Sequence, residues 1–221
     1  MHIPDGFLDP RLSTSLLGAA AVVLAYSTAK VREAVTAVQP VAALAAAGKG
    51  AGNLVSGLKR VLTGDGRRTL YLMGMMAALI FTVQLFDFEI INGTTGHFLG
   101  GALAGIVLGP FAGTLAIAAV LIAQALFMND GGLLALGANI VSMAVVGSML
   151  AYYLYFGLKR LTPEWLAIMI AVWLSVQLAV LTYSLETASL NQSMLHAHLI
   201  IGLAEALVTL ALVKLFRSFQ S

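Results

Sequence analysis

Long apolar segments recur along this chain and leave little room for a water-soluble fold. As helices, each would approach or exceed the roughly 30 Å thickness of the hydrocarbon core of a bilayer. The candidates are residues 12–29, 69–86, 111–127, 133–158, 165–184 and 195–213. Only 10% of the residues are charged, whereas about 25% are charged in soluble domains. The sequence therefore predicts an all-α polytopic membrane protein.

A shorter apolar segment, residues 98–109, decides the topology. It ends at Gly109-Pro110 and would measure only about 18 Å as a helix. If 98–109 and 111–127 are separate passes and the N-terminus is outside, eleven of the twelve Lys and Arg residues are cytoplasmic. A single kinked helix would instead place Lys159 and Arg160 outside, against the positive-inside tendency. We therefore predict one domain, residues 1–221, with about seven transmembrane helices and a cytoplasmic C-terminus.

The segment of residues 33–68 differs from the predicted spans. It is rich in Gly and Ala and carries five Lys and Arg residues. Its apolar stretch, 41–47, is too short to cross a membrane. We interpret 33–68 as a cytoplasmic loop that contains a candidate amphipathic surface helix.

The N-terminus has the composition of a metal chelator. The amine of Met1, the backbone nitrogen of His2 and the His2 ring can close two fused chelate rings on one ion. Planar nitrogen donors suit Ni²⁺ or Cu²⁺, with Co²⁺ as a further candidate, and suit Zn²⁺ or Mg²⁺ poorly. The amide must lose its proton to bind, so affinity should fall at low pH. The alternative is a frayed terminus. Asp5 and Asp9 make the segment unlike a cleaved signal peptide, so we expect residues 1–11 to be retained.

A second histidine, His97, lies in a polar, glycine-rich stretch between two apolar segments. The stretch Asn92–Gly101 cannot itself be a span, and the apolar segment after it is short. Short, glycine-interrupted segments point to binding sites inside membrane proteins. Irregular backbone at that depth requires protein or water around it. We therefore expect His97 to lie below the membrane surface, facing the interior.

Three further polar residues fall inside predicted spans. Glu205 is mid-span and must be paired or face a cavity. His198 lies two helical turns before it on the same face, and Asn139 lies one turn inside the fifth span. His198 is either a core histidine bonded to a neighbouring helix or, with Glu205, part of a shell that orients a metal ligand. His196 is expected at the edge of a loop.

Other functional classes find less support in the sequence. There is no cysteine, and hence no disulfide or thiolate metal site. The basic residues follow the topology, so the charge does not indicate nucleic-acid binding. No P-loop is present, so the chain is not expected to hydrolyse ATP or to act as an enzyme. A metalloenzyme built on His196, His198 and Glu205 would lack the ligand spacing of known metalloproteases. A purely structural membrane subunit is the other alternative.

Four stretches together resemble the CbiM/NikM family, the substrate-binding membrane subunits of cobalt and nickel energy-coupling-factor (ECF) transporters. They are MHIPDGFL, GTTGHFLGGALAGIVLGP, GGLLALGANIVSMAVVG and AHLIIGLAEALVT. The resemblance implies an additional N-terminal helix on a six-helix core. It also implies a planar site of four nitrogens, formed by the Met1 amine, the His2 amide and ring, and His97. Many members have Ser-His-Pro-Thr-Gly where this chain has Gly96-His97-Phe98-Leu99-Gly100, which leaves the site geometry open.

The same resemblance implies the setting of the protein. The chain would lie in the inner (cytoplasmic) membrane and bind no cofactor beyond the transported Ni²⁺ or Co²⁺. Its partners would be a transmembrane coupling subunit, cytoplasmic ATPase subunits and, in cobalt systems, a small accessory membrane subunit. Small-residue stripes on the first two spans, at Ala21, Ala25 and Ala29 and at Gly74, Ala78 and Thr82, are candidate docking faces.

Overall fold

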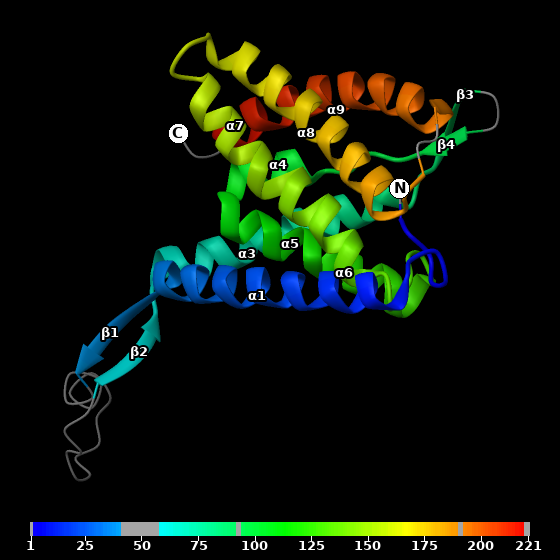
Figure 1. Cartoon of the computed structure of the whole chain (residues 1–221). Coiled ribbons are helices and arrows are strands. Elements are labelled where there is room, and N and C mark those ends of the chain that lie inside the picture. The colour runs from blue at the N-terminus through cyan, green and yellow to red at the C-terminus, as the bar shows by residue number, and fades with distance from the viewer. Residues whose placement is uncertain (1, 41–57, 92–93, 190–191, 219–221) are drawn as a thin grey trace.

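The computed structural model describes residues 2–40, 58–91, 94–189 and 192–218, and most of these residues are helical (Figure 1). The helices are α1 (Pro10–Val35), α3 (Gly64–Gln84), α4 (Gly101–Leu108), α5 (Pro110–Ala123), α6 (Leu136–Asn139), α7 (Ala151–Leu158), α8 (Glu164–Glu186) and α9 (Gln192–Ser218). A π-helical segment η1 (Gln124–Met128) extends α5, and another, η2 (Ile140–Leu150), joins α6 to α7.

Five helices in the described part of the chain are long and apolar enough to cross a membrane. They are Pro10–Val35, Pro110–Met128, Leu136–Leu158, Glu164–Glu186 and Gln192–Phe216. They confirm five of the predicted spans and make the chain a multi-pass membrane protein. The predicted span 69–86 coincides with most of α3, which carries charges in its first turns. The predicted span 98–109 contains the eight-residue α4, because residues 97–100 are not helical.

The chain reverses direction between α4 and α5. Gly109 has a φ of 87°, a left-handed conformation that ends α4, and Pro110 begins α5. A Cβ added to Gly113 would lie 2.7 Å from the backbone nitrogen of Gly105, so the two helices pack back to back. Gly105 and Gly113 therefore serve helix packing, and the alternative of one kinked helix is excluded.

The loop predicted at 33–68 is structured where it is described. Helix α1 continues to Val35, and α3 already begins at Gly64. Between them, strands β1 (Thr36–Pro40) and β2 (Leu58–Leu62) pair antiparallel, with Thr36 opposite Leu62. The predicted boundaries are therefore wrong by a few residues, since helix and strand continue into the segment. The candidate surface helix lies in 41–57, outside the described residues.

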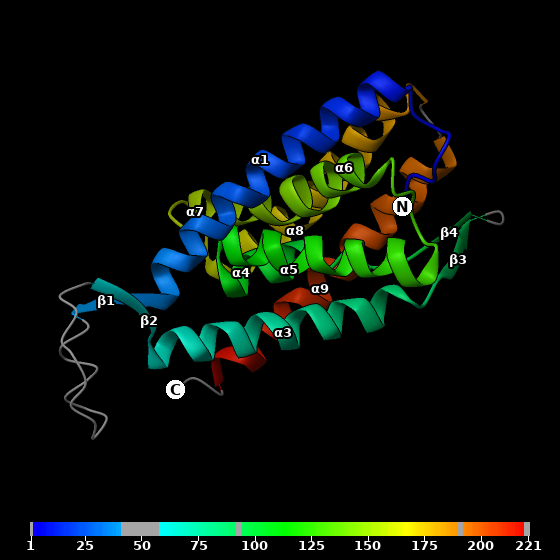
Figure 2. The same ribbon diagram turned by 90° about the horizontal axis from the view of Figure 1, so that it is seen from below.

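Different segments of the chain lie at the two ends of the molecule. The N-terminus and the hairpin of β3 (Phe88–Ile91) and β4 (Thr94–Gly96) lie at one end, and β1, β2 and the C-terminus lie at the other (Figures 1 and 2). The main core lies between these ends and is centred on apolar side chains such as Ile117, Met143 and Val172. A smaller apolar cluster seats the N-terminal segment on α6.

Candidate metal site

The N-terminal segment is anchored to the loop and helix that follow η1. Ile3 is completely buried, against Ala135 and Ala138 among others. Its backbone N–H donates to Oδ1 of Asn139 at 2.8 Å, and its carbonyl accepts from Nδ2 of Asn139 at 3.1 Å. The amide of Asn139 thus pairs with the backbone of Ile3 as a neighbouring strand would. Asn139 therefore positions the segment that carries His2.

A second anchor is the carboxylate of Asp5. It accepts hydrogen bonds from the backbone N–H groups of Leu133, Leu134 and Ala135, at 2.8–3.2 Å. These N–H groups precede α6 and have no partner within that helix. Gly132 packs so closely that an added Cβ would lie 2.0 Å from the Asp5 carboxylate. A turn at Asp5 and Gly6 folds the chain back onto this loop.

The ring of His2 lies inside the protein, beside an acidic residue of the same loop. The His2 side chain is 5% exposed, and its Nδ1 lies 2.8 Å from Oδ1 of Asp130. The hydrogen bond from His2 lowers the pKa of Asp130, so this carboxyl group stays charged. Among the described residues, Nε2 of His2 is buried without a hydrogen-bond partner. The site therefore places a negative charge beside the first candidate ligand.

His97 lies on the non-helical segment between β4 and α4 and is 5% exposed. Its Nδ1 lies 2.9 Å from the carbonyl oxygen of Phe98. A carbonyl oxygen only accepts, so Nδ1 carries the proton and Nε2 carries the lone pair that a metal needs. Burial lowers the pKa of His97 to about 3, which keeps the ring neutral. The ring is therefore in the form that binds transition metals.

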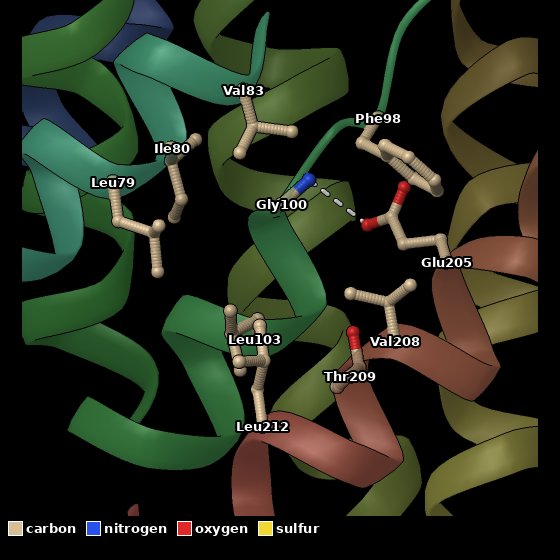
Figure 3. Close-up of a pocket in the computed structure, with 10 residues that line it drawn as sticks. All are labelled: Leu79, Ile80, Val83, Phe98, Gly100, Leu103, Glu205, Val208, Thr209 and Leu212. Atoms are coloured by element: carbon tan, nitrogen blue, oxygen red, sulfur yellow. Dashed lines mark hydrogen bonds between the residues drawn. The ribbon is translucent and has the colours of Figure 1, made fainter.

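Glu205 of α9 holds the segment that carries His97. Its two carboxylate oxygens accept from the backbone N–H groups of Leu99 and Gly100, at 2.8 and 2.9 Å. Figure 3 shows Glu205 reaching from α9 toward Gly100 at the edge of an apolar cavity between α3, α4 and α9. A mid-span carboxylate is thus satisfied by backbone donors rather than by a cation. This contact links Glu205 to the segment that carries His97.

His198 behaves differently. Its Nδ1 lies 2.8 Å from the carbonyl of Met194, one turn back on its own helix, and the side chain is 2% exposed. The ring of His198 thus bonds its own helix, whereas the oxygens of Glu205 bond Leu99 and Gly100. His196 is exposed on α9 rather than at the edge of a loop. In the described ranges, no three or more His, Cys, Asp and Glu side chains are grouped to hold a metal.

The fold brings two distant candidate ligands together. The rings of His2 and His97 have centroids 5.1 Å apart and planes inclined by 31°. Both are buried at the same end of the molecule, near the carboxylate of Asp130. Met1 lies outside the described residues. Two imidazoles beside a backbone amide form a nitrogen-rich site, the donor type that late divalent transition metals prefer.

Sequence reasoning missed two acidic residues of this site. Asp5 and Asp130 have the local sequence of ordinary turn residues, because each is followed directly by Gly. Their partners lie more than 100 residues away along the chain, so no local pattern could pair them. The only available signal was their charge, since both flank otherwise apolar segments at the end that carries His2.

Comparison with known families identifies the fold and its general role. Residues 40–221 match the family model CbiM, described as cobalt uptake substrate-specific transmembrane region. The chain belongs to the CbiM family. Among CbiM relatives, it is 36% identical over 186 residues to a putative fused nickel transport protein NikMN of Archaeoglobus fulgidus. It is 34% identical over 219 residues to a putative metal transport protein of Haloquadratum walsbyi, covering 95% of this chain and 86% of that one.

The match to the fused relatives is partial in length. The alignment with the Archaeoglobus protein covers 84% of this chain but only 52% of that protein, so this chain spans about half of that relative's length. A crystal structure of a transition metal transporter superposes with a TM-score of 0.75 at 25% identity, over 99% of this chain and 93% of that one. The S-component for biotin from an ECF-type ABC transporter superposes with a TM-score of 0.54 at 18% identity, covering 72% and 95%. The latter similarity concerns the fold alone.

Proposed function

We propose that this chain captures Ni²⁺ or Co²⁺ as the substrate-binding subunit of an ECF-type transporter. The ligands would be the Met1 amine, the His2 amide nitrogen, the His2 ring and Nε2 of His97. The family match supports this proposal, as do the names of the relatives, which are nickel, cobalt or metal transport proteins. No cofactor beyond the transported ion is required.

The observation that carries the proposal is the approach of His2 to His97, with ring centroids 5.1 Å apart. These residues are 95 positions apart in the sequence, yet Asn139 anchors Ile3 and Glu205 anchors Leu99, which is consistent with the close approach of the two buried rings. A structural subunit would have no need to bury two histidines side by side. Burying polar rings costs free energy unless a partner compensates, and a divalent ion is such a partner.

Closing the chelate has a consequence for Asp130. The second chelate ring must close through Nδ1 of His2, since Nε2 points away from the backbone of its own residue. In the structure Nδ1 of His2 is bonded to Asp130. Metal binding therefore exchanges the partner of Nδ1, and the charge of Asp130 remains close to the cation. Such a carboxylate attracts a divalent ion to the site.

We further propose how the chain lies in the membrane and which subunits it contacts. We place seven helices across the inner membrane with the N-terminus outside, so that metal enters where His2 lies. The stripes Ala21, Ala25, Ala29 and Gly74, Ala78, Thr82 are exposed on α1 and α3, which suits close contact with a coupling subunit. ATP hydrolysis would be carried out by separate subunits, with a small accessory membrane subunit in addition. The chain would be a transport subunit rather than an enzyme.

The decisive experiment compares the native start with a copy that carries one extra residue before Met1. The addition moves the amine but leaves every side chain in place. We expect the native chain to bind Ni²⁺ and Co²⁺ in titrations of the purified protein, and the extended copy to lose this binding. His97→Ala should also lose it, whereas His196→Ala, an exposed histidine on α9, should not. Equal binding by all four proteins would refute the proposed site.

A further inference from the structure

Two glutamines of the membrane-embedded region take no part in the ligand set described above. Gln84 is the last residue of α3, and Gln124 is the first residue of η1. Their side chains are 3% and 0% exposed. Burying a primary amide is costly unless its donors and acceptors are satisfied. Each of these two amides therefore needs hydrogen-bond partners inside the protein.

Both amides lead to the segment that carries His97. Nε2 of Gln84 donates to the carbonyl of Leu99 at 2.6 Å. Nε2 of Gln124 donates to Oε1 of Gln84 at 2.9 Å. The orientation of both amides is fixed by Leu99, because its carbonyl can only accept. Gln84 must present its nitrogen to Leu99, which leaves its oxygen for Gln124.

These contacts fix two consecutive peptide planes beside His97. In the first plane, the N–H of Leu99 donates to Glu205 and the carbonyl of Phe98 accepts from Nδ1 of His97. In the second plane, the N–H of Gly100 donates to Glu205 and the carbonyl of Leu99 accepts from Gln84. Peptide planes are rigid, so fixing the second restricts the first. The direction of the His97 ring therefore depends on Gln84 as well as on Glu205.

Gln124 also touches the other half of the site. Its backbone carbonyl accepts from the N–H of Asp130 at 3.2 Å, and Asp130 in turn bonds His2. A single residue thus contacts both the loop beside His2 and the chain of amides leading to His97. It begins a π-helical segment, a local distortion that often marks functional sites. In the described part of the chain, its Oε1 is buried without a hydrogen-bond partner.

We propose that Gln84 and Gln124 are positioning residues that aim His97 at the bound ion and fix its placement relative to His2. This inference rests on the proposed function and adds two residues to it. Groups of this kind act by orienting a ligand, and their loss commonly weakens metal binding about 10- to 100-fold. Because Gln124 reaches Leu99 only through Gln84, the two should act as one unit.

The test uses substitutions to methionine, which is unbranched and of similar length but donates no hydrogen bond. We expect Gln84→Met to weaken Ni²⁺ binding about tenfold or more and to shift the visible absorption bands of bound Ni²⁺, which report ligand geometry. Gln124→Met should show a smaller change of the same kind. The double variant should match Gln84→Met alone, since the pair is coupled.

Gln177→Met is the matched control. Its Nε2 also donates to a backbone carbonyl, that of His198, at 2.9 Å, but this contact lies outside the His97 segment. Gln177→Met should leave the absorption bands unchanged.

If Gln84→Met does not fold, Gln124→Met still tests the unit, because it leaves the bond from Gln84 to Leu99 intact. Unchanged affinity and bands in Gln84→Met, or in Gln124→Met if only that variant folds, would overturn the positioning role. Additive losses in the double variant would overturn the coupling. Absence of Ni²⁺ binding by the parent chain would instead overturn the proposed function.

Discussion

The carboxylate of Asp5 accepts three consecutive backbone N–H groups of the loop before α6. Hydrogen bonds to a charged group contribute about 1.5–3 kcal/mol, and this contact holds the segment that carries His2. We expect Asp5→Ala to weaken Ni²⁺ binding about 10- to 100-fold, measured by titration calorimetry.

Asp9→Ala is the control for that prediction. Asp9 also caps backbone N–H groups, those of Arg11 and Leu12 at the start of α1, but it does not touch the loop. Its loss should cost about 1 kcal/mol of helix capping and leave metal affinity unchanged. Equal losses of metal affinity in both variants would mean that the contact between Asp5 and the loop before α6 does not control metal binding.

The pH dependence of binding is also a property of single residues. Burial lowers the pKa of His97 to about 3, so this ring stays neutral across the physiological range. The terminal amine, with an ordinary pKa of about 7.7–8.0, and the His2 amide must instead lose protons to bind. Protons and metal compete for the same lone pairs, so affinity should fall as the pH falls.

We expect the dissociation constant for Ni²⁺ to rise about tenfold per pH unit for each proton released, between about pH 8 and pH 6. Titrations of the purified chain at several pH values measure this slope directly. A dissociation constant that does not change over this range would contradict a chelate formed by the amine and the amide.

The histidines of the candidate site could be predicted from sequence, and their supports could not. His2 follows Met1, and His97 lies in a polar stretch between two apolar segments, so both have a local signal. Asp5, Asp130, Gln84 and Gln124 act through contacts with distant backbone groups, which no spacing along the chain encodes. Of the two alternatives for His198, the orienting role has no contact in the described residues to support it, because its Nδ1 bonds its own helix.

At the scale of elements, close backbone packing around α4 defines the fold near the site. An added Cβ on Gly105 would lie 2.3 Å from the carbonyl oxygen of Ser148 in η2. Overpacking of this kind costs about 1–3 kcal/mol. We expect Gly105→Ala to lower the thermal unfolding temperature of the detergent-solubilised protein. Gly18→Ala on α1 has open space around its Cβ, so an equal loss there would count against this packing.

The elements themselves were predicted unevenly. The break between α4 and α5 was visible because Pro110 and the distribution of charge both required it. The β1–β2 hairpin was missed, since two five-residue strands pair with each other only after the chain has turned. The π-helical segments η1 and η2 were also missed, because they differ from α-helix in hydrogen bonding rather than in apolar pattern.

At the scale of the whole molecule, three pairs of basic residues lie at the end opposite the candidate site. Lys30 and Arg32 near the end of α1, Arg67 and Arg68 at the start of α3, and Lys159 and Arg160 after α7 share the end with β1 and β2 (Figures 1 and 2). His2 and His97 lie at the other end. Positive charge favours the cytoplasmic side, so this distribution supports a site that opens outward.

Orientation can be tested with cysteine labelling, because the chain contains no cysteine. Phe7, beside the candidate site, is 66% exposed, and Leu161, between α7 and α8, is 84% exposed. A membrane-impermeant maleimide should label Phe7→Cys in intact cells and label Leu161→Cys only after the membrane is opened. The unsubstituted chain should not react in either condition. The reverse pattern would place His2 and His97 on the cytoplasmic side and contradict capture of the ion from outside, since the site could then receive metal only from the cell interior.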